Sequence, residues 1–169
     1  MDPDLRTTIL EILDECHDMT VATVRPDGWP QATVVSFAHD GLGIYFGCGS
    51  TAQKAANIAR DPRVSLALTA PYEDWRAIRG LSVAAAAHEV TAADEIERVV
   101  ALMTARFPQL AAMEVAGVPD MKLFRLRPEI VSVLDYRKGF GHTDLVRIGA
   151  DDIAESLETM RHRWPVPEA

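Results

Sequence analysis

The residues best suited to binding chemistry lie between positions 47 and 54. A loop of small and hydroxyl residues, Gly47-Cys48-Gly49-Ser50-Thr51, precedes Gln53 and Lys54 at the predicted start of a short helix. Loop amides, hydroxyls and a lysine would then meet at the positive end of the helix dipole, where an anion is stabilised. The alternatives are a solvated Lys54 and hydroxyls that only cap the helix. A cation at that end is otherwise unfavourable, so the pattern predicts a phosphate site.

Four apolar runs surround this loop and predict the strands that position it. Residues 19–24 and 32–37 flank the turn Arg25-Pro26-Asp27-Gly28, residues 42–46 lead into the loop, and residues 64–69 follow the helical segment. Their alternation is imperfect, which is typical of strands buried on both faces. The order of strands, polar loop and helix start predicts a phosphorylated cofactor held against a small β-barrel.

The remaining segments complete one predicted domain over residues 1–169. An amphipathic helix is expected at 3–17, the barrel core at 19–148 and a closing helix at 151–163. Residues 76–90 contain four consecutive alanines, which favour a helix by propensity. We nevertheless predict a strand there, because glycine and small side chains would admit a close backbone or a flat ligand. Further segments are expected to form a helix at 94–107, strands at 122–126 and 130–134 parted by Arg127-Pro128, and a strand at 145–148.

Composition narrows the class of protein. The 169 residues are 48% hydrophobic and 25% charged, which is typical of a globular domain. A net charge of −8 argues against nucleic acid or an anionic membrane as partner. No apolar run approaches the ~20 residues of a membrane span, and no signal segment is recognised, so a cytoplasmic location is expected. Cys16 and Cys48 are expected to stay unpaired, and the scattered histidines predict no metal site.

The chain resembles the pyridoxamine 5′-phosphate oxidase-like, FMN-binding split-barrel family. The likeness is carried by an Asp-Gly turn with Pro two residues on, a Lys at a helix start, and Asp-Pro-Arg-Val entering the next strand. The matching stretches are residues 19–35, 44–49 and 53–66. The resemblance implies a mainly β, α+β fold: a six-stranded antiparallel split β-barrel with peripheral helices, forming a homodimer.

The resemblance also implies an FMN site at the subunit interface. The flavin ring would lie along the second strand, at Thr33, Val34, Val35 and Ser36. The loop and helix start would take the phosphate, through Cys48, Gly49, Ser50, Thr51, Gln53 and Lys54. Gly80, Leu81 and Ser82 would approach the cofactor, from the same subunit or its partner. True pyridoxamine-phosphate oxidases carry an arginine early in the second strand and a C-terminal Arg- and His-containing signature. Here Ala32 and Thr33 stand at that strand, and Arg161-His162-Arg163 is only similar in composition, which argues against vitamin B6 oxidation.

The expected function is an FMN-dependent oxidoreductase acting on a small organic molecule. A weaker candidate substrate pocket combines Tyr136, Lys138, Phe140 and His142, for which a loop packed on the dimer partner is the alternative. A deazaflavin-dependent reductase would need a basic channel, for which Arg76, Arg79, Arg137 and Lys138 are candidates. A haem-binding protein would need an axial histidine near the pocket. A flavin-binding sensor without turnover is also compatible with the sequence.

Overall fold

The computed structural model describes residues 1–112 and 120–153. Residues 150–153 begin a helix. The remainder of the helix expected over 151–163, together with Arg161-His162-Arg163, lies outside the described residues. The elements in chain order are α1 (Pro3–Glu15), β1 (Asp18–Val24), β2 (Pro30–Asp40), β3 (Gly43–Gly49), α2 (Gln53–Arg60), β4 (Arg63–Thr69), η1 (Trp75–Ala77), β5 (Arg79–Glu89), α3 (Ala93–Arg106), α4 (Gln109–Ala112), β6 (Met121–Asp135), η3 (Tyr136–Lys138) and β7 (Thr143–Arg147).

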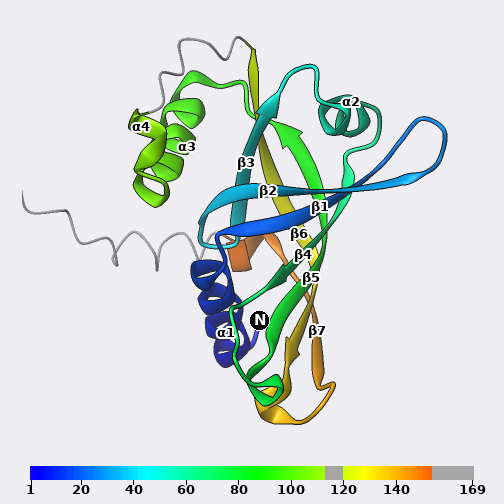
Figure 1. The fold of residues 1–169 in the computed structure, drawn as a ribbon, viewed down its shortest axis with the longest axis vertical. Coiled ribbons are helices and arrows are strands. Elements are labelled where there is room, and N and C mark those ends of the chain that lie inside the picture. Colours follow the sequence, from blue (N-terminus) through cyan, green and yellow to red (C-terminus); the bar gives the residue numbers. More distant parts are fainter. Residues whose placement is uncertain (113–119, 154–169) are drawn as a thin grey trace, which may run out of the picture.

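Six antiparallel strands close into a barrel (Figure 1). The strands are hydrogen-bonded in the order β3-β2-β1-β4-β5-β6, and pairing between β3 and β6 closes the ring. Strand β7 extends the sheet from β6 and takes no part in the closure. The expected mainly β fold, a six-stranded antiparallel barrel with peripheral helices, is therefore confirmed.

The barrel interior is filled by large apolar side chains. Phe46 and Phe124 stack with ring centroids 5.3 Å apart, and both are fully buried. Helix α1 adds Ile9 and Ile12 to the same core. Asp2 caps this helix by accepting hydrogen bonds from the amides of Asp4 and Leu5, as its position before a first-turn proline predicts.

The alanine-rich segment forms strand β5 despite its helical propensity. It pairs with β4 on one side and β6 on the other, so its backbone groups are satisfied by the sheet. Gly80 is needed there for a close approach within the sheet. A Cβ atom built on Gly80 would lie 2.7 Å from the carbonyl oxygen of Leu68 on β4. The glycine is thus explained by the neighbouring strand.

Strand β6 is one element of 15 residues and not the two strands expected. The sequence Arg127-Pro128 does not end it, because the proline lies beside a bulge. Pro128 pairs with Ala85 and Ile130 with Ala84, which leaves Glu129 as the extra residue. A bulge tolerates a proline because one ladder hydrogen bond is already missing there.

The outer face of the barrel carries two adjacent rows of uncharged, mostly small residues. Strand register places them side by side across the sheet. One row is Val34, Thr20, Ala67, Ser82, Ser132 and Leu145, and the next is Ala32, Ala22, Ser65, Ala84 and Ile130, where Arg147 of β7 ends the uncharged run. Val34 and Leu145, at the two ends of the first row, are 70% and 76% exposed. We call these two rows the uncharged barrel face.

Candidate functional site

A groove of about 960 Å³ lies between the β2–β3 wall of the barrel and helix α3. Strand β2 contributes Val34, Val35 and Ser36, and β3 contributes Gly47, Cys48 and Gly49. Lys54 closes one end from the first turn of α2, while Val100 and Met103 line the α3 side. Six residues predicted from the sequence to bind a cofactor are therefore brought together here: Val34, Val35, Ser36, Cys48, Gly49 and Lys54.

Lys54 is a half-buried cation without an anionic partner among the described residues. The chain has two other lysines, and each binds a carboxylate. Lys122 Nζ lies 2.7 Å from Glu89, and Lys138 Nζ lies 2.9 Å from Asp144. In a chain of net charge −8, an unpaired lysine that lines a groove is a ready binding group for an anion.

The N-terminus of α2 adds donors beside Lys54. The N-cap residue is Ala52, and no side chain caps the helix. Neither Ser50 nor Thr51 takes the capping role considered from the sequence. The Ser50 amide instead donates to the carbonyl of Asp120, which ties the loop to the start of β6. The first amides of α2 therefore lack a side-chain acceptor, and an anion in the groove would supply one.

Gly49, the last residue of β3, leaves open space in the wall of the groove. A Cβ atom built on this residue would meet nothing within 4 Å. Its backbone conformation does not require a glycine, because its φ is not in the left-handed region. The absent side chain therefore serves access to the backbone, as expected where a ligand approaches closely.

Cys48 lies in the same wall but does not have the environment of a reactive thiol. Burial raises the pKa of the Cys48 thiol, and the nearby Lys54 and Lys122 only partly oppose this effect. A protonated, buried thiol is a poor nucleophile. Cys16 is also buried, and both cysteines are free, as expected from the sequence.

A buried polar network holds α2 against the barrel. The Asn57 side chain is fully buried and donates to Thr23 Oγ1 at 2.9 Å and to Gln31 Oε1 at 3.0 Å. Gln53 donates to Asn57 Oδ1 at 2.9 Å. Gln53 thus positions the helix that carries Lys54, and it does not line the groove.

Helix α3 supplies a wall that the sequence pattern alone did not reveal. Its Val99 is fully buried against Tyr45 and Val90. Val100 and Met103, one and four positions further on, line the groove. Val100 is 51% exposed. The signal in the sequence was an apolar stripe too wide for a single buried face.

The other predicted residues lie elsewhere in the protomer. Thr33 pairs with the buried Val21 of β1 and is not among the residues that line the groove. Gly80, Leu81 and Ser82 lie at the start of β5, on the other side of the barrel ring. The loop with Tyr136, Lys138, Phe140 and His142 lies at the end of the molecule opposite α2 (Figure 1). In that loop His142 Nε2 is 3.1 Å from Asp144, and Phe140 is 81% exposed.

Residues 1–112 and 120–153 carry neither a metal-binding cluster nor a membrane-spanning helix. Within these ranges no cluster of three or more His, Cys, Asp or Glu side chains has the arrangement to hold a metal ion. In the same ranges, no helix combines the length and apolarity required to cross a bilayer.

Comparison with known proteins places the chain in a family. The model of the pyridoxamine 5′-phosphate oxidase family matches residues 5–135, and the chain belongs to that family. No curated protein matches the sequence. The family membership agrees with the closed antiparallel barrel and with the resemblance noted in residues 19–66.

Solved structures share the fold. A heme binding protein from Mycobacterium smegmatis superposes with a TM-score of 0.75 at 24% identity; the match covers 92% of this chain but 62% of that protein. HutZ, the heme storage protein from Vibrio cholerae, has a TM-score of 0.62 at 27% identity, covering 73% of this chain and 89% of its own. An F420 reductase has a TM-score of 0.56 at 25% identity, covering 72% and 94%.

Proposed function

We propose that this chain is an FMN-dependent oxidoreductase that acts on a small organic molecule as a homodimer. One observation carries the proposal. The unpaired Lys54 and the uncapped start of α2 converge at one end of a groove whose walls are otherwise mainly apolar. This combination suits a molecule with a phosphate at one end and a flat, largely apolar ring at the other.

Binding of the FMN phosphate would need directed hydrogen-bond donors as well as a positive charge. Lys54 supplies a point charge, while the first amides of α2 and the open backbone at Gly49 supply directed donors. The hydroxyls of Ser50 and Thr51 flank this point in the chain and remain proposed ligands. Asn57 and its partners hold the helix in place, so this end of the site is formed before the ligand arrives.

The ring end depends on apolar walls. Val34 and Val35 of β2 and Val100 and Met103 of α3 line a volume of about 960 Å³, which lies within the usual range for cofactor sites. When bound, FMN supplies the electron and hydride transfer. The protein would hold the ring against β2, orient it by backbone groups and exclude bulk water.

No side chain of the described groove residues is a carboxylate or an imidazole. The Cys48 thiol is kept protonated by burial. The groove therefore offers no evident general acid or base, and we assign no obligatory proton transfer to a side chain of this wall.

The uncharged barrel face supports the homodimer. Two adjacent outer rows, one without charge across six strands and the other across five, are unusual in a chain that is 25% charged. Interface cores are similarly depleted of charged residues. Val34 belongs both to this face and to the groove, so a partner seated there would border the cofactor. A two-fold axis parallel to the strands would bring the β2 edge of one protomer against the β5–β7 side of the other. Gly80, Leu81 and Ser82 would then reach the partner's site.

The charge distribution weighs against a deazaflavin coenzyme, although the F420 reductase shares the fold. The four cations considered for a basic channel are all bound to carboxylates: Arg76 to Asp74, Arg79 to Glu11 and Glu15, Arg137 to Asp135, and Lys138 to Asp144. Arg76 in η1 and Lys138 in η3 lie at the end of the molecule opposite α2 (Figure 1).

Haem is the second candidate, and the likeness to HutZ, the heme storage protein, favours it. An axial ligand is needed, however, and none of the described histidines lines the groove. Met103 and Met121 do line it and offer thioether sulfurs as alternative ligands. FMN remains the better fit because no described histidine lines the groove as an axial ligand for haem iron; Lys54 does not separate the two cofactors, since a haem propionate would also pair with it.

The deciding experiment is an absorption spectrum of the untagged protein before and after incubation with FMN and desalting. Retained flavin bands near ~450 nm support the proposal, whereas a strong band near ~400 nm after purification would indicate haem. The flavin-loaded protein is then mixed with NADH or NADPH. Rapid bleaching supports an oxidoreductase, and slow, substrate-independent bleaching would indicate a flavin-binding protein without turnover.

A further inference from the structure

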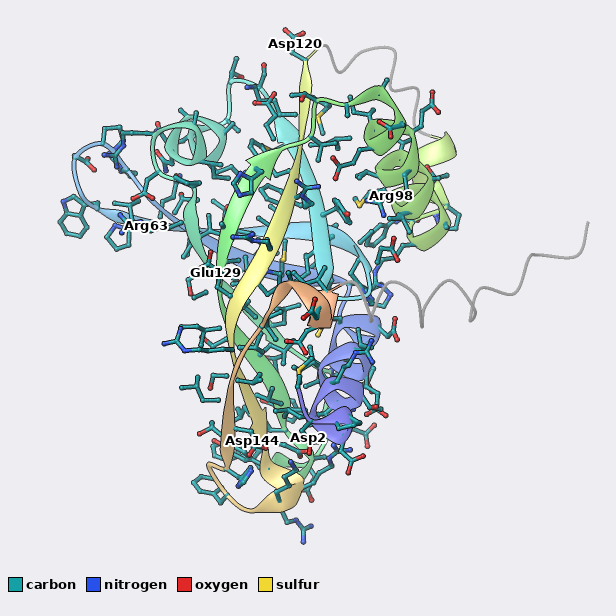
Figure 2. All side chains as sticks on the ribbon, turned by 180° about the vertical axis from the view of Figure 1, so that it is seen from behind. Asp2, Arg63, Arg98, Asp120, Glu129 and Asp144 are labelled. Atoms are coloured by element: carbon teal, nitrogen blue, oxygen red, sulfur yellow. The ribbon has the colours of Figure 1, made fainter. Side chains whose placement is uncertain are left out.

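A second cavity, of about 640 Å³, lies on the outer wall formed by β3, β5 and β6. Helix α3 separates it from the cofactor groove, because Arg98 of this helix lines the cavity while Val100 and Met103 line the groove. Figure 2 shows the cavity side of the molecule, with Arg98 on α3 and Glu129 on β6 labelled. The residues after β7 form the remaining rim, as far as Ile153.

Positive charge gathers in this cavity. Four arginines line it: Arg98 from α3, Arg125 and Arg127 from β6, and Arg147 from β7. His88 of β5 adds an imidazole, and Glu129 is the one carboxylate in the lining. Such a concentration is notable in a chain of net charge −8.

Neighbouring carboxylates neutralise only part of this charge. Asp40 accepts a hydrogen bond from Arg98 at 2.7 Å, and Glu95 accepts one from Arg125 at 2.9 Å. Both arginines still present other N–H groups, since a guanidinium carries five donors. These two pairs fix the direction of the side chains and do not use up their capacity to donate.

Arg127 and Arg147 are held less tightly than the other arginines that line the cavity. Arg127 forms an ion pair with Glu129 at 3.6 Å, which is too long for a hydrogen bond, and Arg147 has no partner among the described residues. By contrast, Arg63 and Arg76 are each held by two side-chain hydrogen bonds to a neighbouring aspartate. Two guanidinium groups with free donors therefore face one cavity.

The cavity floor holds a further donor. Tyr45 is 2% exposed, and its Oη accepts a hydrogen bond from Arg98 at 2.7 Å. Burial raises the pKa of Tyr45, which keeps the phenol protonated. Its own O–H has no acceptor among the described residues, so it is available to donate into the cavity.

We propose that this cavity binds a small oxyanion with two or more negative charges, such as a phosphorylated or polycarboxylate metabolite. Arg127 and Arg147 would bind it directly, and Arg98 and Tyr45 would form the floor. Guanidinium groups bind carboxylate and phosphate in a bidentate manner, which suits both chemistries. The site takes a small ligand because the cavity is bounded by α3 and by the residues that follow β7.

This site is independent of the proposed cofactor site. It shares no lining residue with the groove, and it lies on the other side of α3. A phosphate compound could nevertheless also bind beside Lys54. The test therefore separates the two sites by substitution.

The test is isothermal titration with pyrophosphate and, separately, with citrate. Arg147→Gln and Arg127→Gln should each weaken binding about tenfold, as expected for the loss of a charged hydrogen-bond donor. Arg76→Gln is the matched control, because Arg76 is an exposed arginine outside the cavity that is paired with Asp74. Lys54→Ala should leave the pyrophosphate affinity of this site unchanged.

Each binding result either supports or overturns the second anion site. Binding that falls in Arg147→Gln and persists in Lys54→Ala supports the second site, whether or not FMN binds in the groove. Binding that disappears in Lys54→Ala and persists in Arg147→Gln overturns it. An absence of binding for both probes in the unmodified protein also overturns it. A preference for pyrophosphate or citrate tells whether the natural ligand carries phosphate or carboxylates.

Discussion

Substitution of Lys54 by alanine tests the site most directly. The side chain lines the groove without a carboxylate partner, so its removal breaks no ion pair within the described residues. We therefore expect the free energy of unfolding to change by less than about 0.5 kcal/mol. The affinity for FMN should change much more, because a charged hydrogen bond contributes about 1.5–3 kcal/mol. This corresponds to an increase in Kd of roughly 10- to 150-fold.

The assay is a titration of the apoprotein with FMN and with riboflavin, followed by flavin fluorescence. Riboflavin has the ring but lacks the phosphate, so Lys54→Ala should weaken FMN binding and leave riboflavin binding nearly unchanged. Lys138→Ala serves as the control lysine, since Lys138 is paired with Asp144 at the opposite end of the molecule. Equal losses for both ligands would show that Lys54 contacts the ring or shapes the groove. Unchanged FMN affinity would refute the phosphate assignment.

Four further substitutions test individual contacts of the fold. Gly49→Ala should leave the melting temperature unchanged, because the new Cβ would meet nothing within 4 Å, but it should lower the amount of flavin retained on desalting. Gly80→Ala should lower the free energy of unfolding in urea by about 1–3 kcal/mol, because the new Cβ would lie 2.7 Å from the carbonyl oxygen of Leu68. Ala67→Glu places a charge in the uncharged barrel face and should convert a dimer to a monomer in light scattering; an unchanged mass would place the interface elsewhere. Hydrogen bonds from Arg137 hold the pKa of Asp135 below its ordinary value, so this carboxylate contributes stability that is present above about pH 4 and is lost as pH falls through its lowered pKa. Asp135→Asn should cost about 1.5–3 kcal/mol at pH 7, and the difference between variant and parent should shrink as the pH is lowered below 4.

Local sequence signals were sufficient to predict the structure where a residue type permits few backbone conformations. Asp2-Pro3 predicted the start of α1, and the structure places the cap at Asp2. The prediction of a strand within residues 76–90 was confirmed, although alanine favours helices. The glycine that supported this prediction is needed where the β4 backbone passes close to β5. The same kind of reasoning was wrong at Pro128. A proline shows that a backbone donor is missing, but only the partner strand decides whether the strand ends or bulges there.

The candidate site likewise has one wall that local sequence predicted and one that only the packing of helices decided. The loop and helix start at 47–54 were recognisable because an anion site needs a lysine and free amides close together in the chain. The opposite wall, with Val100 and Met103, depends on how α3 packs across the barrel. The helical periodicity shows an apolar stripe wider than one buried face, but it does not tell which residues of the stripe are buried in the core and which line a groove.

The sequence by itself predicted the family and its six-stranded antiparallel barrel, through the resemblance carried by residues 19–35, 44–49 and 53–66. The order of strand, polar loop and helix start also indicated the chain segment that carries Lys54, because that pattern is local. Only the tertiary structure decided which cations are free. Arg79 looked like part of a basic channel but is bound to Glu11 and Glu15 of α1, whereas Arg127 and Arg147 line one cavity with few carboxylate contacts. The pairing of Arg79 depends on the distance between side chains far apart in the chain, and that distance is fixed only when α1 packs on the closed barrel.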